Sequence, residues 1–212
     1  MKKLNPKESI LNASADLFAQ KGFSGVGVRD IAQKAGVNIS MISYYFGGKI
    51  GILKAINEVY FTEIGRIVRE VSEKPLSHKE EFKYIVQGIV EFFLKKKSFC
   101  KVAILEMPFD YPELADYKFN LLRNNVIFVR KTLKKGFRIG DTNKHIIIGP
   151  AFISLVSSNF LFGDMLSAAL KIKFDKEFYY EYIETITELF LYGICGLQKK
   201  CRKTKKILCS KK

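Results

Sequence analysis

The feature that most constrains this chain is the segment of residues 28–53, VRDIAQKAGVNISMISYYFGGKIGIL, which joins short apolar helix patterns through glycine turns. Gly36 separates the first two patterns, and Gly47 with Gly48 separates the second from a third that starts at Lys49. Two short helices joined by a tight turn outline a helix-turn-helix, which lays its second helix in the DNA major groove. The segment therefore predicts a helical domain that binds DNA.

A further helix is predicted before this segment. Asn5 is suited to cap its start, Pro6 suits its first position, and Glu8 completes a capping-box pattern. Gly22 suits its end, where a left-handed residue is favoured. The chain thus begins with a helix that packs beside the helix-turn-helix.

The helix that would enter the groove spans about residues 39–45. It follows Asn38, whose side chain can cap its first turn. The domain organisation that results is a three-helix DNA-binding domain over residues 3–63, with the helix-turn-helix at about 26–45.

The charge distribution favours a polyanionic partner. The net charge is +15 at pH 7. Residues 1–54 carry eight Lys or Arg against three acidic residues, and residues 199–212 carry eight against none. This basic tail has too few apolar residues to fold alone, so we expect a solvated or frayed end.

Helical periodicity dominates the rest of the chain, and the alternation typical of strands is almost absent. The sequence therefore predicts an all-α fold of about nine helices, with a larger helical domain over residues 64–198. The long helices expected in it span about 49–71, 79–97, 113–135, 142–170 and 176–197.

The third helix could belong to a plain three-helix subdomain whose glycines only make turns. A face meant only for solvent would usually carry Lys or Glu, yet this one offers Ile39, Ser40, Ser43 and Tyr44. Arg29 and Lys49 also stand at helix starts, where a cation opposes the helix dipole but can meet a phosphate. These features favour DNA binding.

Three motifs make the segment of about residues 3–60 resemble the DNA-binding domain of TetR/AcrR transcriptional regulators. They are ILNASADLFAQKGF at 10–23, VRDIAQKAGV at 28–37 and ISYYFGGK at 42–49. The family usually has Thr and then Ser or Thr where this chain has Val26 and Gly27, and often Tyr at the position of Ser43.

The resemblance implies that the third helix enters the major groove. It also implies that Arg29 and Lys49 hold phosphates. The residues expected to contact DNA around this helix are Asn38, Ile39, Ser40, Met41, Ser43, Tyr44 and Tyr45.

No enzyme or metal chemistry is indicated. The GGK run ending at Lys49 lacks the pattern of a phosphate-binding loop, since Ser43 and Ile50 stand where Gly and Ser or Thr are required. Only His78 and His145 could join the cysteines in a metal site, and neither is spaced like a ligand. We expect no cofactor, no metal and no catalytic residue.

The four cysteines, at 100, 195, 201 and 209, form no Cys-x-x-Cys pair. The first 18 residues lack the apolar stretch of a secretion signal. We therefore expect a cytoplasmic protein whose thiols are reduced.

Residues 146–163 contain no charge over 18 positions, the lower limit for a membrane-spanning helix. We favour a buried interface helix, because Pro150 interrupts the stretch and no second span exists, and expect no membrane partner. With the last helix it predicts a symmetric four-helix dimer interface, the same pair that the resemblance implies. The predicted contacts are Phe152, Leu155, Asn159, Phe160, Tyr182, Ile186 and Phe190.

The body is rich in aromatic side chains, which most often belong to a core. The resemblance implies in addition a pocket for a small effector, and the scarcity of charge on these faces favours a largely apolar or aromatic one. The predicted pocket residues are Phe93, Phe99, Met107, Phe109, Tyr117, Leu121 and Phe152.

The sequence thus predicts a homodimeric transcriptional repressor that an effector releases from a pseudo-palindromic double-stranded operator. Two alternatives are a non-specific nucleic-acid-binding protein that uses the basic ends, and an enzyme with a DNA-binding appendage.

Overall fold

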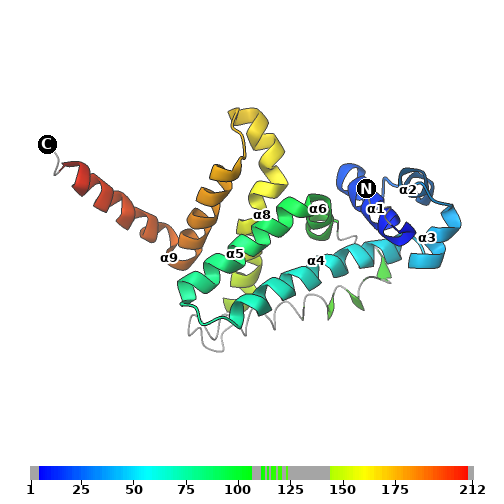
Figure 1. Ribbon diagram of the computed structural model, residues 1–212, viewed down its shortest axis with the longest axis horizontal. Helices are drawn as coiled ribbons and strands as arrows, with labels where there is room; N and C mark the ends of the chain where they lie inside the picture. The colour runs from blue at the N-terminus through cyan, green and yellow to red at the C-terminus, as the bar shows by residue number, and fades with distance from the viewer. Residues whose placement is uncertain are drawn as a thin grey trace. The chain divides into compact units, whose positions relative to one another are not determined.

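The computed structural model describes residues 5–106 and 144–209, and between them Tyr111, Pro112, Leu114, Asp116, Tyr117, Phe119, Asn120 and Arg123. Of residues 144–146 and 194–209 only the backbone is described. These parts of the chain are helical and contain no strand, which confirms the predicted all-α class (Figure 1). Their helices are α1 (Pro6–Lys21), α2 (Val28–Ala35), α3 (Ile39–Phe46), α4 (Lys49–Ser72), α5 (His78–Lys95), α6 (Lys97–Leu105), α8 (Lys144–Leu170) and α9 (Lys176–Cys209).

The chain forms two compact units, each assembled from two stretches of sequence. The reader unit consists of Met1–Arg66 and Phe92–Phe128, and the body unit of Ile67–Glu91 and Val129–Lys212. The helices α4 and α5 each have one end in the reader unit and the other end in the body unit. The predicted linear boundaries near residues 63 and 198 stay predictions.

The reader unit has an apolar core shared by α1–α4 and α6. In Figure 1, α1, α2 and α3 gather around the first turns of α4. The ring of Phe18 meets that of Phe23 edge-on, with centroids 5.2 Å apart. The residues that form this core are Ile10, Ala15, Leu17, Phe18, Phe23, Val26, Ile31, Ala32, Ile42, Ile52, Leu53, Ile56, Phe99, Val102 and Leu114.

The short helices of the reader unit end at the predicted caps. The Asn5 side-chain oxygen accepts a hydrogen bond from the Glu8 N–H at 2.9 Å, and Asn38 accepts one from the Ser40 N–H at 2.9 Å. Gly36 ends α2 in the left-handed region, with φ of 67°. An eight-residue helix such as α2 or α3 gains little from its own ladder, so caps and core contacts define it.

Two helix ends differ from the predictions. The helix expected over 79–97 stops at Lys95, because Lys96 leaves helical geometry (φ −131°, ψ 42°) and α6 begins after it. The last helix was expected to end near residue 197 and be followed by a frayed tail. Instead α9 resumes after a break at Gly193 (φ 63°, ψ −169°) and continues to Cys209, since Lys, Arg and Leu are good helix formers. The helix predicted over 113–135 lies largely outside the described residues.

Aromatic rings join α5, α8 and α9 in the body unit. Phe82 of α5 stacks on Phe190 of α9 with centroids 4.9 Å apart, and Phe152 of α8 lies 4.9 Å from Phe82. An ion pair between Lys83 and Glu184 links α5 to α9 at the rim. The first half of α9 is therefore held against α5 and α8.

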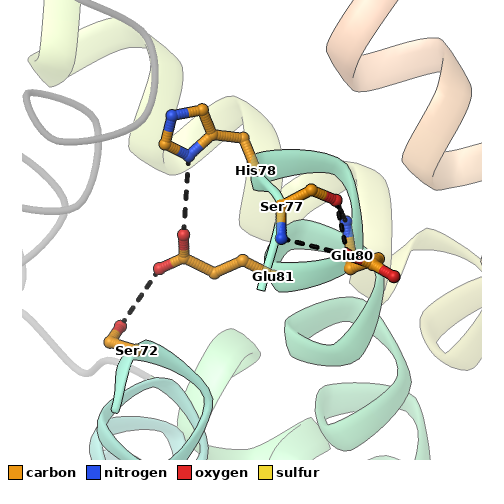
Figure 2. A network of polar contacts seen from close by, with 5 residues as sticks. All are labelled: Ser72, Ser77, His78, Glu80 and Glu81. Atoms are coloured by element: carbon orange, nitrogen blue, oxygen red, sulfur yellow. Dashed lines mark hydrogen bonds and ion pairs between the residues drawn. The ribbon is translucent and has the colours of Figure 1, made fainter. Parts of the chain in front are cut away.

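The start of α5 is fixed by a capping box (Figure 2). The Ser77 N–H donates to the Glu80 carboxylate at 3.0 Å, and the Glu80 N–H donates to the Ser77 hydroxyl at 3.4 Å. Hydrogen bonds from Ser77 lower the pKa of Glu80. The neighbouring Glu81 carboxylate accepts from the Ser72 hydroxyl at 3.3 Å and lies 3.8 Å from His78 Nδ1, so it ties the end of α4 to α5.

The side chains predicted for a dimer interface are buried or half-buried and make contacts within the body unit. Phe152 and Phe190 pack on Phe82, and the Tyr182 hydroxyl donates to the Leu155 carbonyl at 3.0 Å. The other predicted contacts, Asn159, Phe160 and Ile186, are buried. These residues make contacts between α8, α9 and α5 within the body unit, and their predicted role in a dimer interface stays a prediction.

A different apolar surface of α8 is exposed. The side chains of Phe162 and Met165 are 54% and 64% exposed, and that of Ile147 is exposed as well. By length and composition alone, residues Ile147–Leu170 are the one described helix that could cross a membrane. Because Val156 and Phe160 of the same helix are buried against the body unit, α8 has one packed face and one open face.

Candidate nucleic-acid interface

The helix α3 has one buried face and one face that is open to a partner. Ile42 is buried in the reader core, while Ser40 and Ser43 are exposed. Ile39 is exposed and Tyr44 is 83% exposed. Four of the residues expected to contact DNA therefore lie together on the open face, where short and flat side chains can approach base edges.

Met41 and Tyr45 are placed differently from these four. Both are partly buried and pack against the reader core. The Tyr45 ring also meets the Tyr44 ring edge-on, with centroids 5.0 Å apart. In this structure Met41 and Tyr45 seat α3 on the core, so their predicted DNA contacts stay predictions.

Asn38 is engaged in capping. Its side-chain oxygen accepts from the Ser40 N–H and, at 2.8 Å, from the Ser40 hydroxyl. The amide nitrogen is the part of Asn38 that could still meet DNA.

The start of α2 is capped without the hydroxyls that the family usually has. The carboxylate of Asp30 accepts a hydrogen bond from the Gly27 N–H at 2.8 Å. The side chain of Val26 is buried in the core, where a hydroxyl would have no use. Arg29, in the first turn, is exposed and has no hydrogen bond or ion pair among the described residues, as a phosphate-binding cation requires.

Lys49 has a structural role that the sequence did not indicate. Its ammonium donates to the Phe23 carbonyl at 2.8 Å and to the Val26 carbonyl at 2.9 Å, and lies 4.2 Å from the centroid of the Phe23 ring. Burial lowers the pKa of this ammonium. Lys49 thus clamps the turn between α1 and α2 to the start of α4, and one of its three N–H groups remains for a phosphate.

The backbone of Phe23 is held through both its N–H and its carbonyl. Its carbonyl accepts from Lys49, and its N–H donates to the Glu106 carboxylate at 2.8 Å. Glu106 directly follows α6. The turn before the helix-turn-helix is therefore tied to α4 and to the end of α6. Because Glu106 lies 83 residues from Phe23, no local pattern could predict this contact.

A second polar chain runs from α6 into the helix-turn-helix. The Ser98 hydroxyl donates to the Asp16 carboxylate of α1 at 2.6 Å. The other oxygen of Asp16 lies 3.6 Å from the Lys34 ammonium of α2. The helices α6, α1 and α2 are thus linked by side chains as well as by the apolar core.

The junction between α3 and α4 depends on Gly51. A Cβ atom at this position would overlap the carbonyl of Phe46, the last residue of α3. Gly47, which was predicted to turn the chain, adopts the left-handed conformation with φ of 68°. The close approach at Gly51 fixes the angle between α3 and α4. The sequence alone did not distinguish Gly51 from an ordinary helical glycine.

The predicted pocket residues that the structure describes belong to both units. In the reader unit, Phe93 is buried beside Tyr60, with ring centroids 6.2 Å apart, and Phe99 is part of the core. The Tyr117 hydroxyl donates to the Lys54 carbonyl at 2.9 Å. Phe152 lies in the body unit. Met107, Phe109 and Leu121 lie outside the described residues, and the pocket stays a prediction.

Cys100 of α6 is buried, and burial raises the pKa of its thiol to about 12. A neutral buried thiol is a poor nucleophile and a poor metal ligand. Within the described residues, no group of three or more His, Cys, Asp or Glu side chains could hold a metal ion. The side chains of Cys195, Cys201 and Cys209 lie outside the described part.

Residues 10–56 match the family model of the bacterial regulatory proteins of the tetR family. The helix-turn-helix region of this chain is therefore of the tetR type. The match covers most of α1, all of α2 and α3, and the start of α4, which are the elements that present the open face of α3.

The individual proteins that this chain resembles are regulators as well. It is 48% identical over 59 residues to the probable HTH-type transcriptional regulator YttP of Bacillus subtilis, a match that covers 27% of this chain and 28% of that regulator's length. It is 25% identical over 145 residues to the HTH-type transcriptional regulator RutR of Escherichia coli K12, covering 66% and 68% of the two chains.

The solved structure of FadR from Bacillus subtilis, in complex with stearoyl-CoA, has the same fold. It superimposes with a TM-score of 0.67 over 88% of this chain and 98% of that one, at 19% identity. At this identity the likeness concerns the fold alone.

Proposed function

We propose that this protein is a homodimeric transcriptional repressor of the tetR type that leaves its operator when it binds a small, largely apolar or aromatic effector. The observation that carries the proposal is the open face of α3, where Ser40, Ser43 and Tyr44 project from a helix anchored by Ile42. Such a face, on a rigidly capped helix, suits the DNA major groove.

In this proposal the contacts to the DNA backbone come from residues on both sides of α3. Arg29 at the start of α2 and the remaining N–H of Lys49 at the start of α4 would hold phosphates, beside the free amides of those helix ends. Because Ser40 and Ser43 make few bidentate base contacts, part of the specificity would depend on DNA shape.

The proposed dimer uses the exposed apolar side chains of α8 and α9. Phe162 and Met165 on α8, with Tyr180 and Tyr192 on α9, are exposed in the single chain. Burying them against a second copy would remove apolar surface from water and pair two α3 helices for a pseudo-palindromic operator. The small side chains of Ser154 and Ser158 would let the partner's α8 approach closely.

An effector can act only if it prefers one of two arrangements of the protein. The polar ties of Ser98 and Glu106 connect α6 to the reader helices, so a ligand that shifts α6 would disturb them. Acyl-CoA thioesters are the first effectors to test, because FadR, which shares the fold, was solved with stearoyl-CoA. Because the relatives of this protein are bacterial regulators, we propose that it is located in the cytoplasm.

The decisive experiment measures binding to the DNA that flanks the protein's own gene, by fluorescence anisotropy. Tyr44→Ala should weaken operator binding about tenfold or more without changing the fold, because Tyr44 lies on the open face of α3. The matched control is Tyr84→Ala, which removes an exposed tyrosine from α5. Full operator affinity in Tyr44→Ala would overturn the docking of α3.

Deleting residues 199–212 tests the alternative of non-specific binding. The proposal expects the preference for operator over random DNA to survive, with only the salt-dependent affinity reduced. Loss of that preference with the tail would favour the alternative.

A further inference from the structure

Asn57 is a polar residue on an otherwise apolar face of α4. Its side chain is only 6% exposed, and the neighbouring inward positions hold Leu53, Ile56 and Tyr60, which are buried as well. The Asn57 amide nitrogen donates to the Leu53 carbonyl at 2.9 Å. Its side-chain oxygen, Oδ1, has no hydrogen-bond partner among the described residues.

The orientation of this carboxamide is determined by Leu53. If nitrogen and oxygen were exchanged, Oδ1 would face the Leu53 carbonyl, and two acceptors would oppose each other. The unmatched group is therefore an acceptor, and only a donor can satisfy it. A buried acceptor without a donor lowers the equilibrium constant for folding by about tenfold or more. A ligand that supplies the missing donor removes this cost, so its binding constant gains by the same factor.

Aromatic residues approach α4 on both sides of Asn57. One turn earlier, the Tyr117 hydroxyl bonds the Lys54 carbonyl at 2.9 Å. One turn later, Tyr60 contacts the rings of Phe92 and Phe93, with centroids 6.1 and 6.2 Å away. Two of these residues, Tyr117 and Phe93, are among those that the sequence assigned to an effector pocket.

We propose that Asn57 is the polar recognition group of the effector site, and that its Oδ1 accepts a hydrogen bond from an N–H or O–H group of an apolar or aromatic effector. This inference rests on the proposed function, since it specifies the ligand of the same regulator. It excludes effectors whose buried polar atoms are acceptors only, because two acceptors cannot pair. The amide N–H groups of a CoA thioester would meet the requirement.

The position of Asn57 connects this site to the DNA-binding face. Asn57 lies eight residues after Lys49 on the same continuous helix. An effector held at Asn57 therefore acts on the helix that clamps the α1–α2 turn, without a relay through other elements.

The test compares two probes that differ in one donor, 1-decanol and its methyl ether. Isothermal titration without DNA measures their affinities for the wild-type dimer and for Asn57→Leu. We expect wild type to bind the alcohol about tenfold more tightly than the ether, and Asn57→Leu to bind the two equally. Leucine is close in size to asparagine and leaves no unmatched polar atom, so the variant should fold.

The matched control is Asn159→Leu. Asn159 is likewise buried, and its amide nitrogen has no hydrogen-bond partner among the described residues, but it lies in the body unit. This variant should keep the preference for the alcohol. Loss of the preference in both variants would indicate a general loosening and overturn the assignment to Asn57.

Three results would overturn the inference: equal binding of the two probes to wild type, no saturable binding of the alcohol, or an unchanged preference in Asn57→Leu. If Asn57→Leu does not fold, the wild-type comparison of the two probes still decides. Operator binding is measured separately. A wild-type protein that discriminates the probes but does not bind its operator would overturn the proposed function and leave the site at Asn57 standing.

Discussion

In the reader unit, the helix α1 exposes no large apolar side chain anywhere along its length, whereas α8 in the body unit exposes Ile147, Phe162, Met165 and Leu170. The helices α1, α2 and α3 are short and end at caps or glycines with positive φ, so the polar groups at their ends find partners within the reader unit. The long helix α8 is packed against the rest of its unit on one face only. The contrast indicates that α1 finds its apolar contacts within the reader unit, whereas α8 leaves one apolar face open to a partner.

The strongest way to break this contrast is Gly51→Ala. Because the new Cβ would overlap the Phe46 carbonyl, α3 must move away from α4, at a cost of about 3 kcal/mol in the free energy of unfolding. Urea denaturation measures this loss, and operator binding should disappear with it. Gly65→Ala is the control on the same helix: no atom lies within 4 Å of its added Cβ, so it should stabilise by about 0.5–1 kcal/mol. A Gly51→Ala protein as stable as wild type would show that the junction is not tight.

Phe162→Asp tests the open face of the body unit. A dimer would bury two of these charges at a symmetric interface, so dimerisation should weaken about 100-fold, which is about 2.7 kcal/mol. Sedimentation equilibrium measures the change, and the stability of the monomer should stay the same. Leu94→Asp, which charges an exposed leucine of the reader unit, should leave dimerisation intact. The dimer proposal fails if both variants sediment like wild type.

Lys49→Ala and Arg29→Ala separate clamping from phosphate binding in the reader unit. Lys49→Ala removes the donor to two carbonyls, so it should lower the free energy of unfolding by about 2 kcal/mol. Arg29→Ala should change it by less than about 0.5 kcal/mol. Each variant should also reduce the slope of log affinity against log salt by about 0.9 per lost phosphate contact. Equal stability of the two proteins would argue against the clamp.

Because Cys100 is buried, the free energy of unfolding of the reader unit should fall as pH rises into the alkaline range. Its thiol stays neutral in the folded protein up to a pKa of about 12, whereas in the unfolded chain it ionises from its ordinary value near 9. This stabilisation is complete below pH 9 and is lost as pH rises toward 12, by at most about 1.4 kcal/mol per unit. Cys100→Ala should flatten that slope by one proton when urea denaturation is followed from pH 9 to 10.5. Serines at 195, 201 and 209 keep the other thiols out of the measurement, and an unchanged slope would contradict the role of Cys100.

Local signals explain what the sequence could predict. The ends at Asn5, Gly22 and Asn38 depend on residues within one turn, and the motifs of the helix-turn-helix are contiguous. The contacts of Phe23 with Lys49 and Glu106 were missed because they join residues far apart in the chain.

The two faces of α8 show the same limit in the body unit. Apolar residues occur all around α8, so periodicity could not tell which face packs on the chain itself. Phe152 is half-buried against Phe82, and Phe162 is exposed. Only the tertiary packing of α5 and α9 distinguishes the two faces.

The backbone of Phe23, bonded through its N–H to Glu106 and through its carbonyl to Lys49, also provides a natural reporter. Its amide proton can exchange with solvent deuterium only when the bond to Glu106 opens. The exchange rate of this one proton, followed by NMR, therefore reports how often the end of α6 detaches from the turn before the helix-turn-helix, separately from unfolding of the reader core.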